Sequence, residues 1–234
     1  MRFSSPYFPA ILLRRYKRFL ADVELSSGEV VTVHTPNTGS MLGVATPGMR
    51  VWLRDTQSRT RKYRYSWEIS EPIEHVYVGV HTGLVNALVL EAIGDGTIAE
   101  LQGYTCIEQE VPYGDERSRI DLLLHNQKRC CYVEIKNVTA RDEQAFAIFP
   151  DAVSLRGQKH LRELMRVVAG GQRGVIFYCI QRGDIDGYRP ADEIDAEYGR
   201  LLREAVAKGV EVIAYKAHVT PESIALTQAV QVQI

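Results

Sequence analysis

The sequence predicts an α/β (α+β) protein of two units, a small β-barrel over residues 1–80 followed by a domain with a central, mostly buried sheet over residues 81–234. The first eighty residues contain short strand patterns divided by turn residues. After residue 80, strand and helix patterns alternate. The net charge also changes sign: eleven Lys and Arg against seven Asp and Glu give +4 in the first unit, and seventeen against twenty-two give −5 in the second.

The first unit carries five strand patterns rich in alternating or β-branched residues. Turn residues such as Ser26-Ser27-Gly28 and Thr46-Pro47-Gly48 divide them. Strands are expected at residues 18–25, 30–34, 49–55, 63–70 and 75–80. Five short strands with hardly any helix between them favour a closed barrel of the OB-fold type, and an SH3-like barrel is the alternative.

The second unit alternates helices and strands. Thr82 can cap a helix over 85–93, which Gly94-Asp95-Gly96 ends, and Gly170-Gly171 closes a long helix over 154–169. A third helix is expected at 196–207, before Gly209. Strands are expected at 107–111, 118–125, 131–138, 175–180 and 210–217. This order predicts helices packed on a sheet.

Composition indicates a globular, cytoplasmic protein. Hydrophobic residues are 45% and charged residues 24% of the chain, and no run of eighteen apolar residues exists that could form a transmembrane helix. The basic residues near the N-terminus follow a short apolar stretch, the reverse of the order in a signal peptide. The four cysteines have no CxxC spacing, so we expect reduced structural thiols rather than a zinc site.

Two of the expected strands carry charged residues that point to chemistry. Asp121 lies in an apolar run, and Glu134 and Lys136 lie two apart on the next strand, so the last two share a face. Charged groups in an apolar strand cost desolvation energy unless a metal, substrate or partner offsets it. Two carboxylates can bind Mg²⁺ or Mn²⁺ against a phosphodiester, with Lys136 orienting water. The alternative is a solvated ion pair between Glu134 and Lys136.

The helix expected at 154–169 places one amide toward the sheet. Gln158 lies three residues after Leu155 and three before Leu161, on the apolar stripe. It either contacts the metal site or phosphate, or it is satisfied by backbone within the core. Lys159, His160 and Arg162 flank it and either meet a nucleic acid backbone or form a solvated face.

These residues together resemble the PD-(D/E)xK nuclease-like core. Asp121 stands in its Asp position and Glu134-x-Lys136 forms its ExK element. Glu91 matches the acidic residue of its first helix, and Gln158 resembles the Gln on the helix after ExK. The Pro of the motif is absent, as in many members. The resemblance implies a central mixed sheet, the metal ligands Glu91, Asp121 and Glu134, and catalytic roles for Asp121, Glu134, Lys136 and Gln158.

The whole chain resembles the sugar fermentation stimulation protein A (SfsA) family. The segments that carry this resemblance are residues 15–23 (RYKRFLADV), 34–41 (HTPNTGSM), 116–121 (ERSRID), 132–136 (YVEIK), 149–153 (FPDAV) and 156–164 (RGQKHLREL). It implies an OB-fold domain followed by a nuclease-like domain in a cytoplasmic protein. It also implies DNA binding with little sequence preference and regulation of sugar use, notably maltose.

The first unit fits a nucleic acid role on physical grounds as well, because basic groups attract phosphates and aromatic rings accept stacked bases. Basic residues interleave with Tyr63, Tyr65 and Trp67, and a second basic cluster precedes Phe19. The alternative assigns these aromatics to the barrel core, since alternation puts all three on one face. The residues expected to bind nucleic acid are Arg15, Lys17, Arg18, Arg59, Arg61, Lys62 and Arg64.

The leading hypothesis is therefore a DNA-binding regulator, with single-stranded or structured DNA as its partner and no membrane association. The alternative is a Mg²⁺- or Mn²⁺-dependent endonuclease acting at Asp121, Glu134 and Lys136. A third hypothesis is a protein-interaction module in which these residues serve structure alone. The sequence leaves the oligomeric state open, and a homodimer is one of the possibilities.

Overall fold

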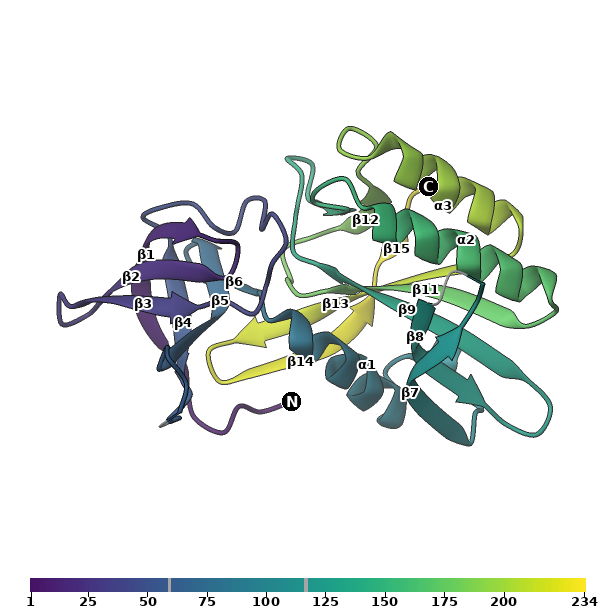
Figure 1. Ribbon diagram of the computed structural model, residues 1–234, viewed down its shortest axis with the longest axis horizontal. Coiled ribbons are helices and arrows are strands. Elements are labelled where there is room, and N and C mark those ends of the chain that lie inside the picture. Colours follow the sequence, from purple (N-terminus) through teal and green to yellow (C-terminus); the bar gives the residue numbers. More distant parts are fainter. Residues whose placement is uncertain (59, 116–117) are drawn as a thin grey trace.

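The computed structural model describes residues 1–58, 60–115 and 118–234. Arg59, which the sequence predicts to bind nucleic acid, lies outside the described residues. The chain is elongated, with a barrel at one end and a layered α/β domain at the other (Figure 1). None of the helices in the described ranges has the length and hydropathy that a bilayer span requires.

The first sheet is a barrel with OB-fold connectivity. Its strands are β1 (Phe8–Tyr16), β2 (Leu20–Leu25), β3 (Val30–His34), β4 (Arg50–Asp55), β5 (Tyr65–Ile73) and β6 (Val76–Gly79). They follow the order β3-β2-β1-β4-β5-β6, and a parallel contact between His34 and Ser66 joins β3 to β5. Strands β1–β5 therefore close on themselves, and β6 extends from β5. The predicted OB-fold is confirmed.

Strand β1 was not among the predicted strands, for a physical reason. Ala10 and Leu12 point into the barrel core, but the intervening Ile11 and Leu13 are apolar and exposed, so the alternation that marks a half-buried strand is missing. The strand predicted from residue 18 begins instead at Leu20. Lys17 and Arg18 form the turn with positive φ values of 50° and 65°.

Trp67 lies at the centre of the barrel core. It is fully buried, and its indole Nε1–H donates to the Ile69 carbonyl at 3.1 Å and to the Ser70 hydroxyl at 3.2 Å. Leu12, Val23 and Leu53 from neighbouring strands are also fully buried in this core. The alternative reading of the aromatics as core residues thus holds for Trp67.

The second part of the chain folds around a mixed six-stranded sheet. Its elements are α1 (Val85–Gly94), β7 (Cys106–Tyr113), β8 (Ser118–His125), β9 (Cys130–Val138), β10 (Phe146–Phe149), α2 (Leu155–Ala169), β11 (Arg173–Ile180), β12 (Gly187–Pro190), α3 (Ala196–Ala207), β13 (Glu211–Thr220), β14 (Ser223–Ala229) and β15 (Gln231–Val232). The sheet order is β14-β13-β11-β9-β8-β7. Strands β9 and β13 run parallel to β11, and β7, β8 and β14 pair antiparallel. The predicted mixed sheet is confirmed.

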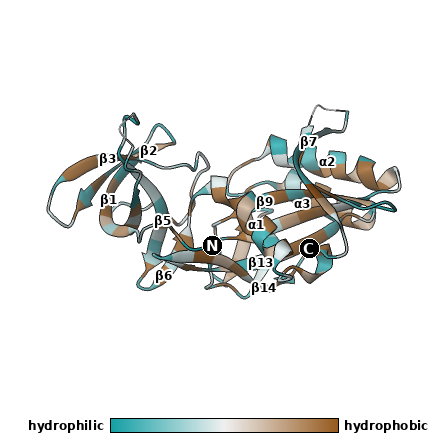
Figure 2. Cartoon of the chain, turned by 90° about the horizontal axis from the view of Figure 1, so that it is seen from below, coloured by the Kyte–Doolittle hydropathy of each residue, from teal (hydrophilic) through white to brown (hydrophobic). Residues whose placement is uncertain are grey.

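Helices cover both faces of this sheet and so bury it, as predicted for a central sheet. Helix α1 packs on the face that carries Val133 and Phe177, and α2 and α3 pack on the face that carries Ile176 and Tyr178. The two cores account for the hydrophobic strands at the centre of Figure 2. A small parallel sheet, β10-β12-β15, was not predicted, because its strands have only two to four residues.

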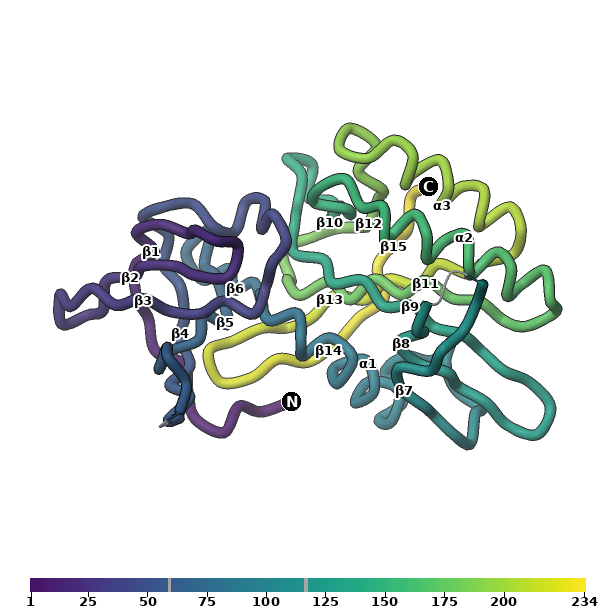
Figure 3. The backbone as a smooth tube through the Cα atoms, in the orientation of Figure 1, coloured from purple at the N-terminus to yellow at the C-terminus, as the bar shows by residue number. Residues whose placement is uncertain are grey.

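Several contacts join the barrel to the α/β domain. The first residues of the chain run along the β13–β14 hairpin (Figure 3), where the Phe3 amide donates to the Glu222 carbonyl at 3.0 Å. The Gly79 amide donates to the Gln181 carbonyl at 2.8 Å. The barrel loop 37–41 contacts Asp151, whose carboxylate accepts from the Met41 amide at 3.0 Å. A division of the chain at residue 80 stays a prediction.

Candidate functional site

The candidate site lies where β8 and β9 separate. Their pairing runs from His125 opposite Cys130 to Leu122 opposite Val133, and it ends there. Beyond this point, Oδ2 of Asp121 accepts a hydrogen bond from the backbone amide of Ile135 at 2.7 Å. The Asp121 carboxylate thus accepts the hydrogen bond that a backbone carbonyl of β8 would otherwise accept. The two strands diverge at Asp121 and Glu134, which the sequence predicts as site residues.

Glu134 and Lys136 share one face of β9, as strand alternation predicts. Glu134 is 2% exposed and Lys136 8% exposed, so the alternative of a solvated ion pair is excluded. Oε1 of Glu134 accepts from Lys136 Nζ at 2.7 Å and from the His160 ring. Its other oxygen, Oε2, is buried and has no hydrogen-bond partner among the described residues. A buried carboxylate oxygen without a partner is costly, which points to a missing ligand.

His160 belongs to this site, although the sequence analysis placed it only among residues that could meet a phosphate. It lies on α2, and its Nε2 accepts from Arg156 Nε at 3.3 Å. This acceptor role assigns the proton to Nδ1, which donates to Glu134 and also lies 2.9 Å from Lys136 Nζ. The position was detectable, because His160 precedes the apolar Leu164 by four residues and so lies on the same helix face.

The titratable groups of the site have pKa values shifted in different directions. Burial, and then the charge of Glu134, raise the pKa of Asp121 to about 6. Burial also opposes ionisation of Glu134, but Lys136 and His160 outweigh it and hold the pKa of Glu134 below its ordinary value. Burial lowers the pKa of His160 more than Glu134 raises it, so this ring is neutral at neutral pH. Asp121 is the group that titrates near neutrality.

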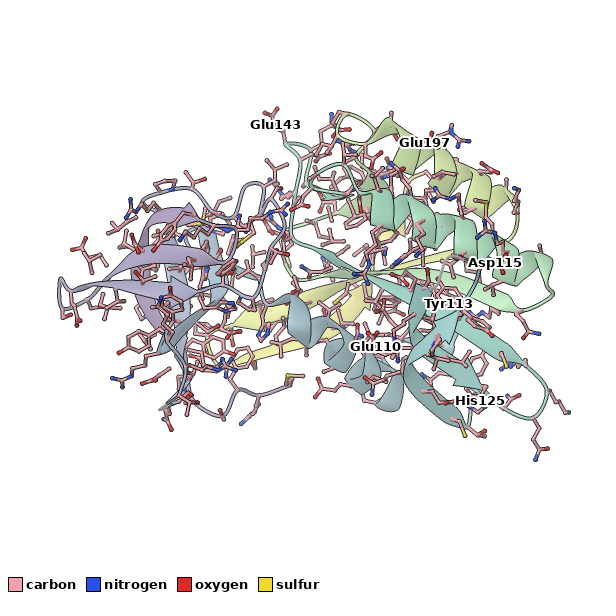
Figure 4. All side chains as sticks on the ribbon, viewed as in Figure 1. Glu110, Tyr113, Asp115, His125, Glu143 and Glu197 are labelled. Carbon is pink, nitrogen blue, oxygen red and sulfur yellow. The ribbon has the colours of Figure 1, made fainter. Side chains whose placement is uncertain are left out.

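Tyr113 at the end of β7 adds a hydroxyl to the neighbourhood (Figure 4). Burial raises the pKa of Tyr113, and the charges of Glu134 and Asp121 raise it further, so its hydroxyl stays protonated. That hydroxyl is buried without a hydrogen-bond partner in the described part of the chain. No sequence pattern indicated this residue, because β7 reaches the site only through pairing with β8.

The residues present fit a small, hard divalent cation. Such ions prefer oxygen ligands, and Mg²⁺ is commonly held by one or two carboxylates together with water and phosphate oxygens. Glu134 offers the unpartnered Oε2, and Asp121 keeps one oxygen beyond its bond to Ile135. No group of three His, Cys, Asp or Glu side chains suited to a metal occurs within the described ranges. The groups that could hold a cation are therefore two carboxylates, with Lys136 and His160 beside them.

Glu91 does not join these carboxylates, which corrects the predicted metal ligand set. Helix α1 buries Leu88 and Val89 against the face of the sheet opposite to the site. Glu91 is exposed, and its Oε2 accepts from the N-terminal amine of Met1 at 2.6 Å. The helix was predicted correctly, but the sheet face that it covers could not be read from the sequence.

Gln158 is buried, and its partner within the described residues is Asp195 rather than the carboxylates, so its catalytic role stays a prediction. Its amide Nε2 donates to Oδ1 of Asp195 at 2.9 Å. Asp195 is the N-cap of α3 and accepts from the Tyr198 amide at 3.0 Å. Among the described contacts, Gln158 has no hydrogen bond to Asp121, Glu134 or Lys136. Gln158 therefore fastens α2 to α3.

A second candidate surface lies on the barrel. Arg61 and Lys62 border a pocket of about 280 Å³, together with Tyr63, Tyr65 and His34. Lys62 Nζ lies 5.5 Å from the centre of the Tyr63 ring. Arg61 and Lys62 are exposed, and neither forms an ion pair within the described ranges. The structure thus brings two predicted cations and two aromatic rings together around one hollow.

Two other residues that were predicted to contact nucleic acid, Arg15 and Arg64, have partners within the barrel and its loops. Arg15 donates to the carbonyls of Asn37 at 3.0 Å and Gly39 at 2.8 Å, and it also contacts the carbonyls of Arg18 and Ser40. Arg64 forms an ion pair with Asp55 at 2.6 Å. Both guanidinium groups already have partners within the protein, so a contact of Arg15 or Arg64 with phosphate stays a prediction. Lys17 and Arg18 keep exposed side chains in the β1–β2 turn.

Known proteins resemble this chain over its full length. A family model for the SfsA N-terminal OB domain matches residues 13–80, and a model for the sugar fermentation stimulation protein RE domain matches residues 83–223. A "Sugar fermentation stimulation protein homolog" of Geobacter metallireducens is 56% identical over 99% of both chains. One of Thioalkalivibrio sulfidiphilus is 51% identical, covering 100% of this chain and 98% of the relative.

A solved structure shows the same architecture. Pyrococcus furiosus SfsA in complex with Ca²⁺ is 28% identical, covers 100% of this chain and 98% of its own, and superposes with a TM-score of 0.89. The fold class predicted from the sequence is thereby confirmed: an OB-fold barrel followed by a nuclease-like α/β domain with a central mixed sheet.

Proposed function

Since the chain belongs to the sugar fermentation stimulation protein (SfsA) family, we propose that it is a DNA-binding protein with little sequence preference that regulates sugar metabolism, including maltose metabolism. One observation supports the DNA-binding part most directly. Arg61 and Lys62 lie exposed beside Tyr63 and Tyr65, around a single hollow on an OB-fold barrel.

This arrangement suits a strand of any sequence. Cations attract phosphates irrespective of the base, and aromatic faces stack with every base. Sequence readout instead needs several fixed hydrogen-bonding groups aimed at base edges. The hollow is lined mainly by cations and rings, so it favours single-stranded DNA and discriminates weakly between sequences.

The double substitution Arg61→Gln and Lys62→Gln tests this proposal. It should weaken binding of single-stranded DNA, because two phosphate contacts are lost. The slope of log affinity against log salt concentration should become shallower by about 1.4, roughly 0.7 for each lost contact. Fluorescence anisotropy with a labelled oligonucleotide over a range of salt concentrations measures both quantities.

The matched control is the pair Arg200→Gln and Lys208→Gln, which removes the same charge at α3, away from the barrel. This control should keep the wild-type slope. If both double variants behave alike, the barrel hollow is not the binding surface. If the wild-type protein binds no DNA at low salt, the DNA-binding proposal fails.

A second candidate function is metal-dependent hydrolysis of phosphodiesters at Asp121, Glu134 and Lys136. The unpartnered Oε2 of buried Glu134 supports it, because it leaves a ligand position open beside a second carboxylate. The Pyrococcus furiosus relative is a complex with Ca²⁺, a cation that prefers the same oxygen ligands. Mg²⁺ or Mn²⁺ is therefore the proposed cofactor, held by Asp121 and Glu134.

The cation and the neighbouring side chains would have different roles in this reaction. The bound cation would supply positive charge that polarises the phosphodiester. Lys136 holds a positive charge next to Glu134 and can stabilise negative charge that develops on phosphate oxygens. His160 fixes the orientation of Glu134 by donating to Oε1. Hydrolysis also needs one attacking water molecule, and the burial of Glu134 and Lys136 lowers the local dielectric constant and strengthens these electrostatic interactions.

Asp121→Asn tests this second function without loss of the fold. Asparagine can still accept the hydrogen bond from the Ile135 amide, but it removes a carboxylate oxygen. Cleavage of DNA in Mn²⁺ should fall by about a hundredfold or more, while DNA affinity in EDTA stays at the wild-type value. Asp55→Asn, an exchange at a partly exposed carboxylate of the barrel, is the control. Absence of cleavage by the wild type with Mg²⁺ and Mn²⁺ on single-stranded, duplex and branched DNA would contradict the proposal.

A further inference from the structure

A pocket of about 380 Å³ lies between the barrel and the α/β domain. We call it the junction pocket. Its walls come from five places in the chain: the barrel loop 37–39, Thr82 just after the barrel, residues 137–140 at the end of β9, the residues Ile148, Phe149 and Asp151 around the end of β10, and Arg156 in the first turn of α2. Its volume falls within the range of about 300–1,000 Å³ that is typical of ligand sites.

We propose that the junction pocket binds one unstacked nucleotide, with Arg156 on the phosphate and Phe149 beside the base. The nucleotide belongs either to a DNA strand or to the pool of free nucleotides, which share this chemistry. The strand form rests on the DNA binding proposed above. The free form does not depend on it.

Arg156 is positioned to receive the phosphate. Its Nε donates to His160 Nε2 at 3.3 Å, which fixes the plane of the guanidinium. Its two terminal nitrogens form no hydrogen bond or ion pair with the described residues. A planar guanidinium with two open nitrogens can bind two phosphate oxygens at once.

Other residues of the lining suit a base. Phe149 is half-buried, and its ring is held by edge-on contact with Tyr198 at 5.2 Å between centroids and by a tilted contact with Tyr178 at 5.8 Å. A fixed aromatic ring offers a surface for stacking. Asn137 accepts from Gln181 Nε2 through its Oδ1, which leaves the Asn137 amide nitrogen to donate to a base.

Asp151 also lines the pocket, and a carboxylate would repel a phosphate. Its charge is offset, because Oδ2 accepts from the Met41 amide at 3.0 Å and Arg15 lies near enough to attract it. Its second oxygen can accept from an amino group of a base or a hydroxyl of a sugar. The pocket therefore offers donors and an acceptor, as a nucleotide requires.

The junction pocket is connected to the carboxylate site. Arg156 lines the pocket and donates to His160, and His160 donates to Glu134. Arg156 is thus two hydrogen bonds from Glu134, and a phosphate bound to Arg156 would be three hydrogen bonds away. A nucleotide held here brings the strand that contains it to the edge of the candidate active site.

The experiment uses the full chain in EDTA, with deoxythymidine monophosphate and a labelled single-stranded oligothymidylate as probes. Calorimetry measures the first and anisotropy the second. Arg156→Gln should weaken binding of the mononucleotide by about tenfold or more, because charge-assisted hydrogen bonds to phosphate are lost. Thr38→Trp, at the exposed rim of the pocket, should weaken it similarly by filling the pocket. Arg200→Gln, the matched control on α3, should bind within about twofold of wild type.

The outcomes separate the pocket from the barrel surface. If both pocket variants also weaken oligonucleotide binding, the pocket holds a nucleotide of a strand. If they weaken binding of the mononucleotide only, the pocket holds free nucleotides. If the wild type binds the mononucleotide but no oligonucleotide, the pocket again holds free nucleotides, and only the DNA-binding proposal is overturned. If the wild type does not bind the mononucleotide, or if both pocket variants bind it unchanged, the pocket proposal is overturned, whatever the barrel variants show.

Discussion

Replacing Lys136 by Met should lower the free energy of unfolding by about 3–5 kcal/mol at neutral pH. Lys136 and Glu134 are both buried and joined at 2.7 Å, and Asp121 adds a second carboxyl group nearby. Without the ammonium group, Glu134 keeps only His160 as a donor to its Oε1, and its negative charge stays buried. Urea unfolding followed by circular dichroism gives the change directly.

Two further variants show that this loss comes from the buried charge. Adding Glu134→Gln to Lys136→Met removes the unpaired carboxylate and should restore most of the lost stability. Lys208→Met breaks an ion pair with Glu204 that is exposed, so it should cost less than about 1 kcal/mol. Equal losses for Lys136→Met and Lys208→Met would show that burial of the pair has no energetic consequence.

Asp121→Asn should raise the free energy of unfolding by about 2–3 kcal/mol at pH 8. Burial raises the pKa of Asp121 from 3.8 to about 6, so the folded protein holds this proton to a higher pH than the unfolded chain does. Between about pH 4 and pH 6 the folded state binds more protons, and stability therefore falls as the pH rises. The loss is complete above the folded pKa. Asparagine carries no charge, so the Asp121→Asn variant does not lose this stability as the pH rises.

The measurement is the urea midpoint of both proteins from pH 4.5 to pH 8. The curves should lie closest at the acidic end, separate as the pH rises towards 6 and run parallel above it. Asp55→Asn is the control of opposite sign, because its hydrogen bonds from Arg64 hold the pKa of Asp55 below its ordinary value. Curves for wild type and Asp121→Asn that are parallel over the whole pH range would remove the case for a destabilised carboxylate. The expected curves match a functional site that is maintained at a cost in stability.

The fold class was predictable because it follows from local patterns. Turn residues and short alternating runs indicated a barrel, and the three helices of the second domain were predicted within about one residue of their observed bounds. Strand β1 was missed because apolar side chains lie on both of its faces. The strands β10, β12 and β15 were missed because they are too short to carry a pattern.

The candidate site was predictable only in part. Alternation along β9 placed Glu134 and Lys136 on one face, and the structure agrees. Glu91 and Gln158 were assigned to the site by resemblance, but their partners are Met1 and Asp195. Which neighbour a helical side chain meets depends on how the helix is placed on the sheet, and that placement is decided by packing of the whole domain.

The sequence by itself determined the two kinds of unit, the faces of the strands and the charged trio of Asp121, Glu134 and Lys136. These follow from periodicity, which is a property of neighbours along the chain. The tertiary structure decided three features: the divergence of β8 and β9, the contact of His160 with Glu134, and the junction pocket. Each joins residues far apart in the sequence, and their positions are fixed by hydrophobic burial and hydrogen bonding throughout the fold rather than by any local pattern.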